Sequence, residues 1–144
     1  KEWTAVLPQV LSNLGTSHVL VVHGEDGLDE VTTTAKTHIA EVSSGRLREY
    51  TISPEQFGIP LAESSELAGG DLQQNVRIAR SVLEGRPGAW RDIVVLNAGC
   101  AIYAADKAGS IEEGIRMAQE AIDSGKALEK LELLKKYSHN NEMK

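Results

Sequence analysis

A run of four apolar residues, Val-Leu-Val-Val at positions 19–22, constrains the fold of this chain more than any other segment. A strand without alternation between polar and apolar side chains is expected to be buried on both faces, as the strands of parallel sheets are. Directly before it, apolar residues recur at helical spacing over positions 6–14, and Gly15 gives a natural stop. A helix that leads into such a strand predicts an α/β fold with parallel pairing.

Two strands joined by a tight turn are predicted next. Residues 37–42 and 46–52 are rich in Thr, Ile, Val and Tyr, and Ser-Ser-Gly at 43–45 separates them. This arrangement favours an antiparallel hairpin. A single helical turn is expected over residues 53–58, because Ser, Pro and Gln stand at its N-cap, first and third positions and Gly58 ends it.

The second half of the chain predicts helices. Asp71 is the expected N-cap of an amphipathic helix that Gly85 ends. Residues 89–107 are apolar on nearly all sides, which predicts a central buried helix. A capping box at residues 110–113 opens the next helix. We expect one α/β domain over residues 1–138, containing a last helix, and a polar tail over residues 139–144.

Composition excludes several classes of protein. The 144 residues suffice for one globular core, and the net charge of −6 without any basic block argues against a nucleic-acid or membrane partner. The single Cys100 cannot form an internal disulfide, and no apolar run is long enough to span a bilayer, so a cytoplasmic location is expected. Because the chain enters a helical pattern at once and lacks an initial Met, we expect it to be the later part of a longer protein.

The segment His-Gly-Glu-Asp-Gly-Leu-Asp-Glu at positions 23–30 is the main candidate site. It follows the apolar strand, and in open α/β sheets ligands bind beyond the carboxyl ends of strands. Mg2+ prefers oxygen ligands and often binds one or two carboxylates together with substrate phosphates. On chemistry alone, Asp29 and Glu30 are either metal ligands or solvated carboxylates that a helix dipole favours. The same two interpretations apply to Glu25 and Asp26.

Other candidates have two interpretations each. His23 could orient a phosphate, or it is a half-buried side chain at the strand end. The Gly-Gly-Asp turn at 69–71 resembles an anion-binding turn, but a tight turn with an Asp N-cap also explains it. Asn97 interrupts the buried helix and must be hydrogen-bonded there, either as a structural link to a loop or neighbouring helix or as a ligand contact. The sequence has no Walker motif, GxGxxG motif or nucleophile elbow, and no His pair has the spacing of zinc ligands.

Val-Val-His-Gly-Glu-Asp-Gly-Leu-Asp-Glu at positions 21–30 closely resembles the segment of anthranilate phosphoribosyltransferases that carries their Asp-Glu metal motif. The resemblance extends over residues 1–138. Four supporting segments follow in the same order: Pro-Glu-Gln-Phe-Gly at 54–58, Leu-Ala-Gly-Gly-Asp at 67–71, Leu-Asn-Ala-Gly at 96–99 and Ala-Ile-Asp-Ser-Gly-Lys-Ala at 121–127.

The resemblance implies a function and a site. Enzymes of this family transfer the phosphoribosyl group of phosphoribosyl pyrophosphate to anthranilate, giving N-(5-phosphoribosyl)anthranilate and pyrophosphate in tryptophan biosynthesis. It implies Mg2+ as cofactor, with Asp29 and Glu30 as metal ligands, directly or through water. The implied fold is α/β, part of a mixed, mainly parallel sheet flanked by helices, with a β-hairpin, as in the C-terminal domains of nucleoside phosphorylases and phosphoribosyltransferases. The full-length protein is expected to be a homodimer.

The chain also departs from the family. Four features of the family have no counterpart in this sequence. They are the glycine-rich phosphate loop, the basic segment, the anthranilate-binding arginine and the helical N-terminal domain. We therefore assign no catalytic residue and expect this part to supply the Mg2+ side of the site and to be inactive alone. The alternatives are a pyrimidine nucleoside phosphorylase-like enzyme, a non-enzymatic nucleic-acid-binding relative of the same fold, and a structural or regulatory module.

Overall fold

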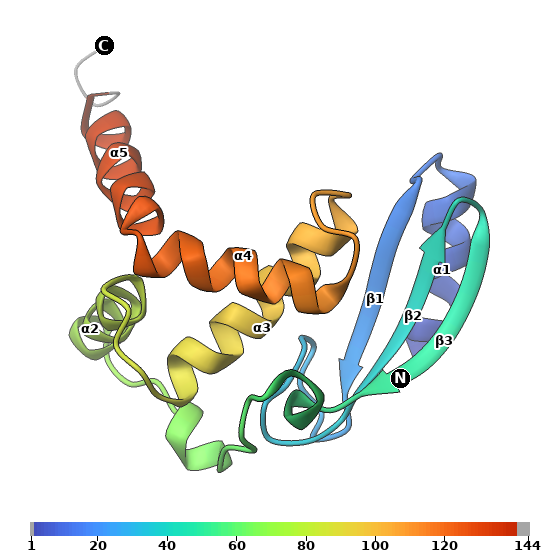
Figure 1. Ribbon diagram of the computed structural model, residues 1–144, viewed down its shortest axis with the longest axis horizontal. Coiled ribbons are helices and arrows are strands. Elements are labelled where there is room, and N and C mark those ends of the chain that lie inside the picture. The colour runs from blue at the N-terminus through green and yellow to red at the C-terminus, as the bar shows by residue number, and fades with distance from the viewer. Residues whose placement is uncertain (1, 141–144) are drawn as a thin grey trace.

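The computed structural model describes residues 2–140, without the side chains of residues 2, 139 and 140. A three-stranded sheet stands at one end of the molecule, and four α-helices gather at the other (Figure 1). Helix α1 (Glu2–Asn13) packs against the sheet and contains Pro8 in its middle. None of the helices within residues 2–140 is long and apolar enough to cross a membrane.

The sheet consists of β1 (His18–Gly24), β2 (Thr37–Ser43) and β3 (Arg46–Ile52), in that spatial order. The predicted hairpin is confirmed. Strands β2 and β3 pair antiparallel, and Ser44 and Gly45 between them have φ angles of 52° and 74°. Positive φ at both loop residues matches the right-handed twist of the flanking strands.

The expected mainly parallel pairing is not found within the described residues. Strand β1 also pairs antiparallel with β2, from His18 opposite Ser43 to Gly24 opposite Thr37. A parallel pair needs a crossover connection, usually a helix, whereas residues 25–36 form a loop that returns the chain directly beside β1. The apolar composition of β1 instead fits its cover on both faces, by α1 on one and by the hydrophobic core on the other.

Within the described residues, six helical segments follow the sheet. They are the 3₁₀ turns η1 (Pro54–Phe57) and η2 (Ser64–Leu67) and the helices α2 (Leu72–Leu83), α3 (Ala89–Ala104), α4 (Ile111–Asp123) and α5 (Lys126–Asn140). The predicted caps are confirmed: Asp71 accepts a hydrogen bond from the Gln74 amide, and Ser110 accepts one from the Glu113 amide. The turn η2 lies in a segment for which the sequence analysis predicts neither helix nor strand. Helix α5 continues into the predicted polar tail, of which residues 141–144 lie outside the described part.

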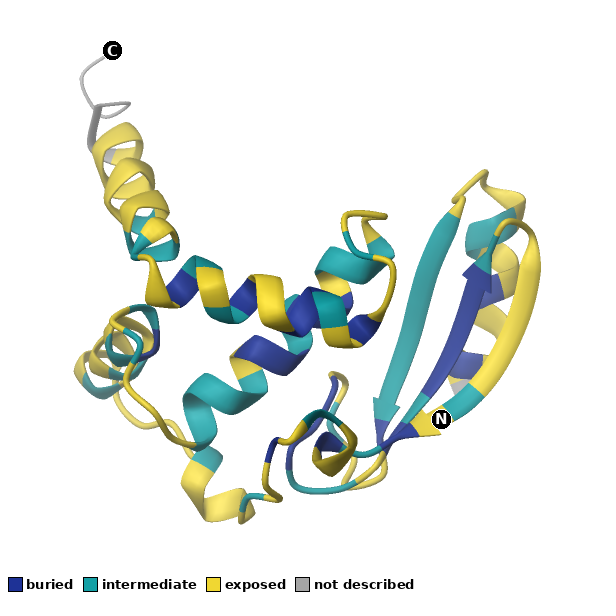
Figure 2. Cartoon of the chain, in the orientation of Figure 1, coloured by how far each residue is buried: buried dark blue, intermediate teal, exposed yellow. Residues whose placement is uncertain are grey.

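The hydrophobic core joins Ile39 of β2 and Val31 of the preceding loop to buried residues of α3 and α4. All of these segments carry dark blue stretches in Figure 2. Helix α3 is the predicted central helix. Its buried residues are Val95, Leu96, Gly99 and Cys100. It crosses α4 at Gly99 and Gly114, where an added Cβ on either glycine would collide with backbone atoms of the other helix. Side chains are therefore excluded from this crossing, and the two helices form one close-packed pair.

Candidate functional site

The acidic segment forms the first part of the loop between β1 and β2, residues 25–36. Backbone hydrogen bonds close the base of this loop. The Gly24 amide donates to the Leu28 carbonyl at 2.9 Å, and the Glu25 amide donates to the Lys36 carbonyl at 2.8 Å. The loop is thus an ordered structure whose two ends lie beside each other.

Asp26 links the first and second parts of the loop. Its carboxylate accepts hydrogen bonds from the Thr32 hydroxyl at 2.5 Å, from the Thr34 hydroxyl and from the Leu28 amide at 3.1 Å. Desolvation raises the pKa of Asp26, but these donors outweigh it and leave the pKa below its ordinary value. Because its oxygens are engaged in this way, Asp26 has a structural role, and its metal-ligand interpretation is not supported.

Asn97 of α3 holds the far side of the same loop. Its Oδ1 accepts a hydrogen bond from the Val31 amide at 3.0 Å, and its Nδ2 donates to the Val31 carbonyl at 2.7 Å. Nδ2 also donates to the Ile93 carbonyl one turn earlier in α3, at 3.0 Å. The structural link predicted for this amide is confirmed, and its partner is the residue that follows Glu30.

Asp29 and Glu30 lie between these two anchors. Both are exposed, and neither makes a hydrogen bond or ion pair within the described part of the chain. Their oxygens are therefore available to solvent or ligand. No group of three or more His, Cys, Asp or Glu side chains among residues 3–138 could hold a metal ion by itself. Two carboxylates fit Mg2+ nonetheless, since this ion keeps several waters and takes further oxygens from phosphates.

The positions of the other sequence candidates agree with their structural interpretations. His23 is half-buried and lies opposite His38 in the β1–β2 register. At the Gly-Gly-Asp turn, the Gly70 amide donates to Asn75 Oδ1 at 2.9 Å, and Asp71 caps α2. The amide that could receive an anion is thus already paired, which favours the turn-and-cap interpretation.

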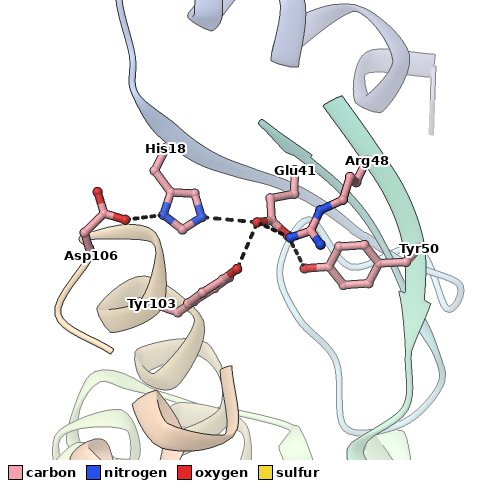
Figure 3. Close-up of polar contacts among 6 residues, drawn as sticks. All are labelled: His18, Glu41, Arg48, Tyr50, Tyr103 and Asp106. Atoms are coloured by element: carbon pink, nitrogen blue, oxygen red, sulfur yellow. Dashed lines mark hydrogen bonds and ion pairs between the residues drawn. The ribbon is translucent and has the colours of Figure 1, made fainter. Parts of the chain in front are cut away.

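A buried carboxylate that sequence reasoning missed lies between the sheet and α3. Glu41 of β2 is only 1% exposed. Figure 3 shows it at the centre of a polar cluster. It accepts hydrogen bonds from the hydroxyls of Tyr50 and Tyr103, at 2.8 and 2.9 Å, and from Arg48 at 3.0 Å. His18 Nε2 lies 3.4 Å from Glu41 Oε1. A signal was present, since Glu41 is a charged residue directly between two apolar residues of a predicted strand.

The electrostatics of this cluster favour the ionised carboxylate. Desolvation raises the pKa of Glu41, but hydrogen bonds from Tyr50, Tyr103 and Arg48 and the charge of Arg48 outweigh it, so the pKa is lowered. Burial and the neighbouring Glu41 raise the pKa of Tyr50. The same two causes raise the pKa of Tyr103. Both tyrosines therefore remain protonated donors, and the cluster fixes α3 to the sheet.

Comparison with known proteins identifies the family. The model of the glycosyl transferase family, a/b domain, matches residues 1–128. This chain belongs to that family. Among its relatives is the anthranilate phosphoribosyltransferase of Methanocorpusculum labreanum, 52% identical over 131 residues, which are 91% of this chain and 38% of that protein. The enzyme of the same name from Methylococcus capsulatus is 52% identical over 92% of this chain and 39% of its own length.

Solved structures agree with the sequence comparison. The anthranilate phosphoribosyltransferase of Thermus thermophilus superposes with a TM-score of 0.82 at 39% identity, over 91% of this chain and 38% of that one. The Saccharomyces cerevisiae enzyme in complex with PRPP and Mg gives a TM-score of 0.77 at 28% identity, over 91% and 37%. The resemblance drawn from the sequence is confirmed. This glycosyl transferase family chain spans about two-fifths of the length of the relatives it matches.

Proposed function

We propose that this chain supplies the Mg2+ side of the active site of an anthranilate phosphoribosyltransferase. One observation carries the proposal: Asp29 and Glu30 are an unpaired, exposed carboxylate pair, within the described residues, on a loop that is fixed on both sides of them. Relatives of that name are 52% identical to this chain over the aligned residues, and one protein of that name is known in complex with PRPP and Mg. Those names favour this function over a nucleoside phosphorylase or a nucleic-acid-binding relative.

The chemistry follows from the charge of the reacting groups. In the proposed reaction the amino group of anthranilate displaces pyrophosphate from the anomeric carbon of phosphoribosyl pyrophosphate. Mg2+, when bound, would neutralise the negative charge that develops on the departing pyrophosphate. Asp29 and Glu30 would hold the ion directly or through water. Because the net charge of −6 on this part of the protein repels a polyanion, a cation on the acidic loop would also help to attract the substrate.

The chain is proposed to be inactive by itself. No segment of it resembles the glycine-rich phosphate loop, the basic segment or the anthranilate-binding arginine of the family. Without those groups, neither the ribose phosphate nor anthranilate would be oriented for displacement, and orientation contributes much of such a rate. Homodimerisation of the full-length protein and a cytoplasmic location remain predictions.

Binding of Mn2+, a paramagnetic substitute for Mg2+, in the presence of pyrophosphate tests the metal assignment. The free Mn2+ signal in electron paramagnetic resonance should fall as the chain is added, and Asp29→Asn with Glu30→Gln should abolish this effect. Glu112→Gln with Glu120→Gln removes the same charge from two exposed carboxylates of α4, outside this loop, and is the matched control. Equal loss of binding in both double variants would reduce the effect to general electrostatics and refute the site.

A further inference from the structure

We propose that Asn97 is a positioning residue for the carboxylate pair of Asp29 and Glu30. This inference rests on the proposed function, because it concerns how the metal pair is held. Asn97 itself does not reach the ion in this proposal. It acts through the backbone of Val31, and three features of the structure support that role.

First, the side chain of Asn97 forms a clamp on Val31, because it binds both polar backbone groups of that residue. The two Asn97 hydrogen bonds to Val31, at 3.0 and 2.7 Å, engage both the amide and the carbonyl of that residue. The Val31 amide belongs to the peptide group that joins it to Glu30. Fixing this amide therefore restricts the rotation that decides where the Glu30 side chain begins.

Second, the clamp is itself rigid. The remaining Asn97 donor goes to Ile93 of the same helix, so the side-chain amide has no free donor left to rotate toward another partner. The helix is fixed in turn, by Tyr103 bonded to Glu41 in the sheet and by Gly99 against α4. Asn97 thus ties the loop to the hydrophobic core of the domain rather than to another loop.

Third, hydrogen-bonded residues flank the carboxylate pair on both sides. Val31 is 1% exposed, and the next amide, that of Thr32, donates to the Thr37 hydroxyl at 3.0 Å. On the other side, the Asp26 carboxylate accepts a hydrogen bond from the Leu28 amide and so fixes Leu28. Asp29 and Glu30 are the two exposed residues between these restraints. Partners that orient metal ligands in this way typically contribute about ten- to a hundredfold to metal affinity.

The test compares two variants of neighbouring α3 residues in the 144-residue chain. Asn97→Leu keeps the approximate size of the side chain and removes the clamp, while Leu96→Val damages the core beside it and leaves the clamp intact. The rate of amide hydrogen exchange at Val31 reports whether its hydrogen bonds to residue 97 are intact. The Mn2+ affinity in the presence of inorganic pyrophosphate reports metal binding by Asp29 and Glu30. We expect Asn97→Leu to speed Val31 exchange and to weaken Mn2+ binding about tenfold, whereas Leu96→Val does neither. Asn97→Ser, which leaves room for water, replaces Asn97→Leu if that variant does not fold.

The outcomes separate the two proposals. If Asn97→Leu releases Val31 and Mn2+ affinity stays within about twofold of the wild type, the positioning role is wrong while the metal site stands. Equal weakening by Leu96→Val would make Asn97 an ordinary core residue and would overturn the inference as well. If the wild-type chain shows no Mn2+ binding that depends on Asp29 and Glu30, the proposed function fails and the positioning role falls with it.

Discussion

Replacement of Gly99 by alanine should destabilise the chain although alanine is the better helix former. The added Cβ would lie 2.5 Å from Ile115 Cγ1, 2.6 Å from Ile115 N and 2.8 Å from Ile115 Cα. Ordinary contacts between such atoms begin at about 3.5 Å, so α4 would have to move by roughly 1 Å. The two backbone atoms cannot rotate away as the end of a flexible side chain could.

The size of the effect follows from two opposing contributions. Overpacking of a close-packed core costs about 1–3 kcal/mol, and the upper end applies where backbone atoms collide. The gain in helix propensity from glycine to alanine is about 1 kcal/mol. We expect a net loss of about 2 kcal/mol in the free energy of unfolding. With a typical urea m-value near 2 kcal/mol per M, the unfolding midpoint should fall by about 1 M.

A control measures the propensity contribution separately. Ala101 is an exposed residue of the same helix, so Ala101→Gly should cost about 1 kcal/mol without any change in packing. Urea unfolding followed by circular dichroism gives both values. If Gly99→Ala is as stable as the wild type or more stable, α4 is not in backbone contact with α3 and the reasoning about this crossing is refuted.

Two further predictions concern titratable groups. The pKa of Glu41 is lowered in the folded chain, so its contribution to stability is complete above its ordinary value near 4.5 and is lost as the pH falls through the folded pKa. Glu41→Gln should therefore flatten the acid limb of a plot of stability against pH, whereas Glu120→Gln, on an exposed carboxylate of α4, should not. Coincident acid limbs for Glu41→Gln and the wild type would contradict this. Burial raises the pKa of the Cys100 thiol to about 12. Iodoacetamide at about pH 8 should alkylate it only after unfolding in urea, as mass spectrometry can show, and rapid alkylation of the folded chain would disprove its burial.

Features determined by neighbouring residues could be predicted from the sequence. Asp71 and Ser110 cap their helices by bonding amides three residues later, and the β2–β3 hairpin is closed by Ser44 and Gly45. Asp29 and Glu30 lie exposed on the predicted loop after β1, and their role as metal ligands remains a prediction. In each case the interacting groups are close in the chain, so local composition contains the information.

Features that depend on distant residues could not be predicted in full. The apolar run of β1 indicates cover on both faces, but cover by α1 and the core produces the same pattern as parallel neighbours. The sequence shows that Asn97 needs a hydrogen-bond partner, yet that partner is Val31, 66 positions away. The Glu41 cluster unites three strands and α3, and nothing local indicates which tyrosines supply its donors.

The close spacing of Asn97 and Gly99 in α3 has a consequence for how this domain can change in length. A single turn of α3 faces both the loop, through Asn97, and α4, through Gly99. One inserted or deleted residue rotates everything beyond it by about 100° and shifts it by about 1.5 Å. A change of this kind between Ala89 and Asn97 would rotate Asn97 and Gly99 relative to the first part of α3. The helix could then not keep both contacts while its first part stays in place. Insertions and deletions should therefore be tolerated better in the connections outside α3 than within the helix.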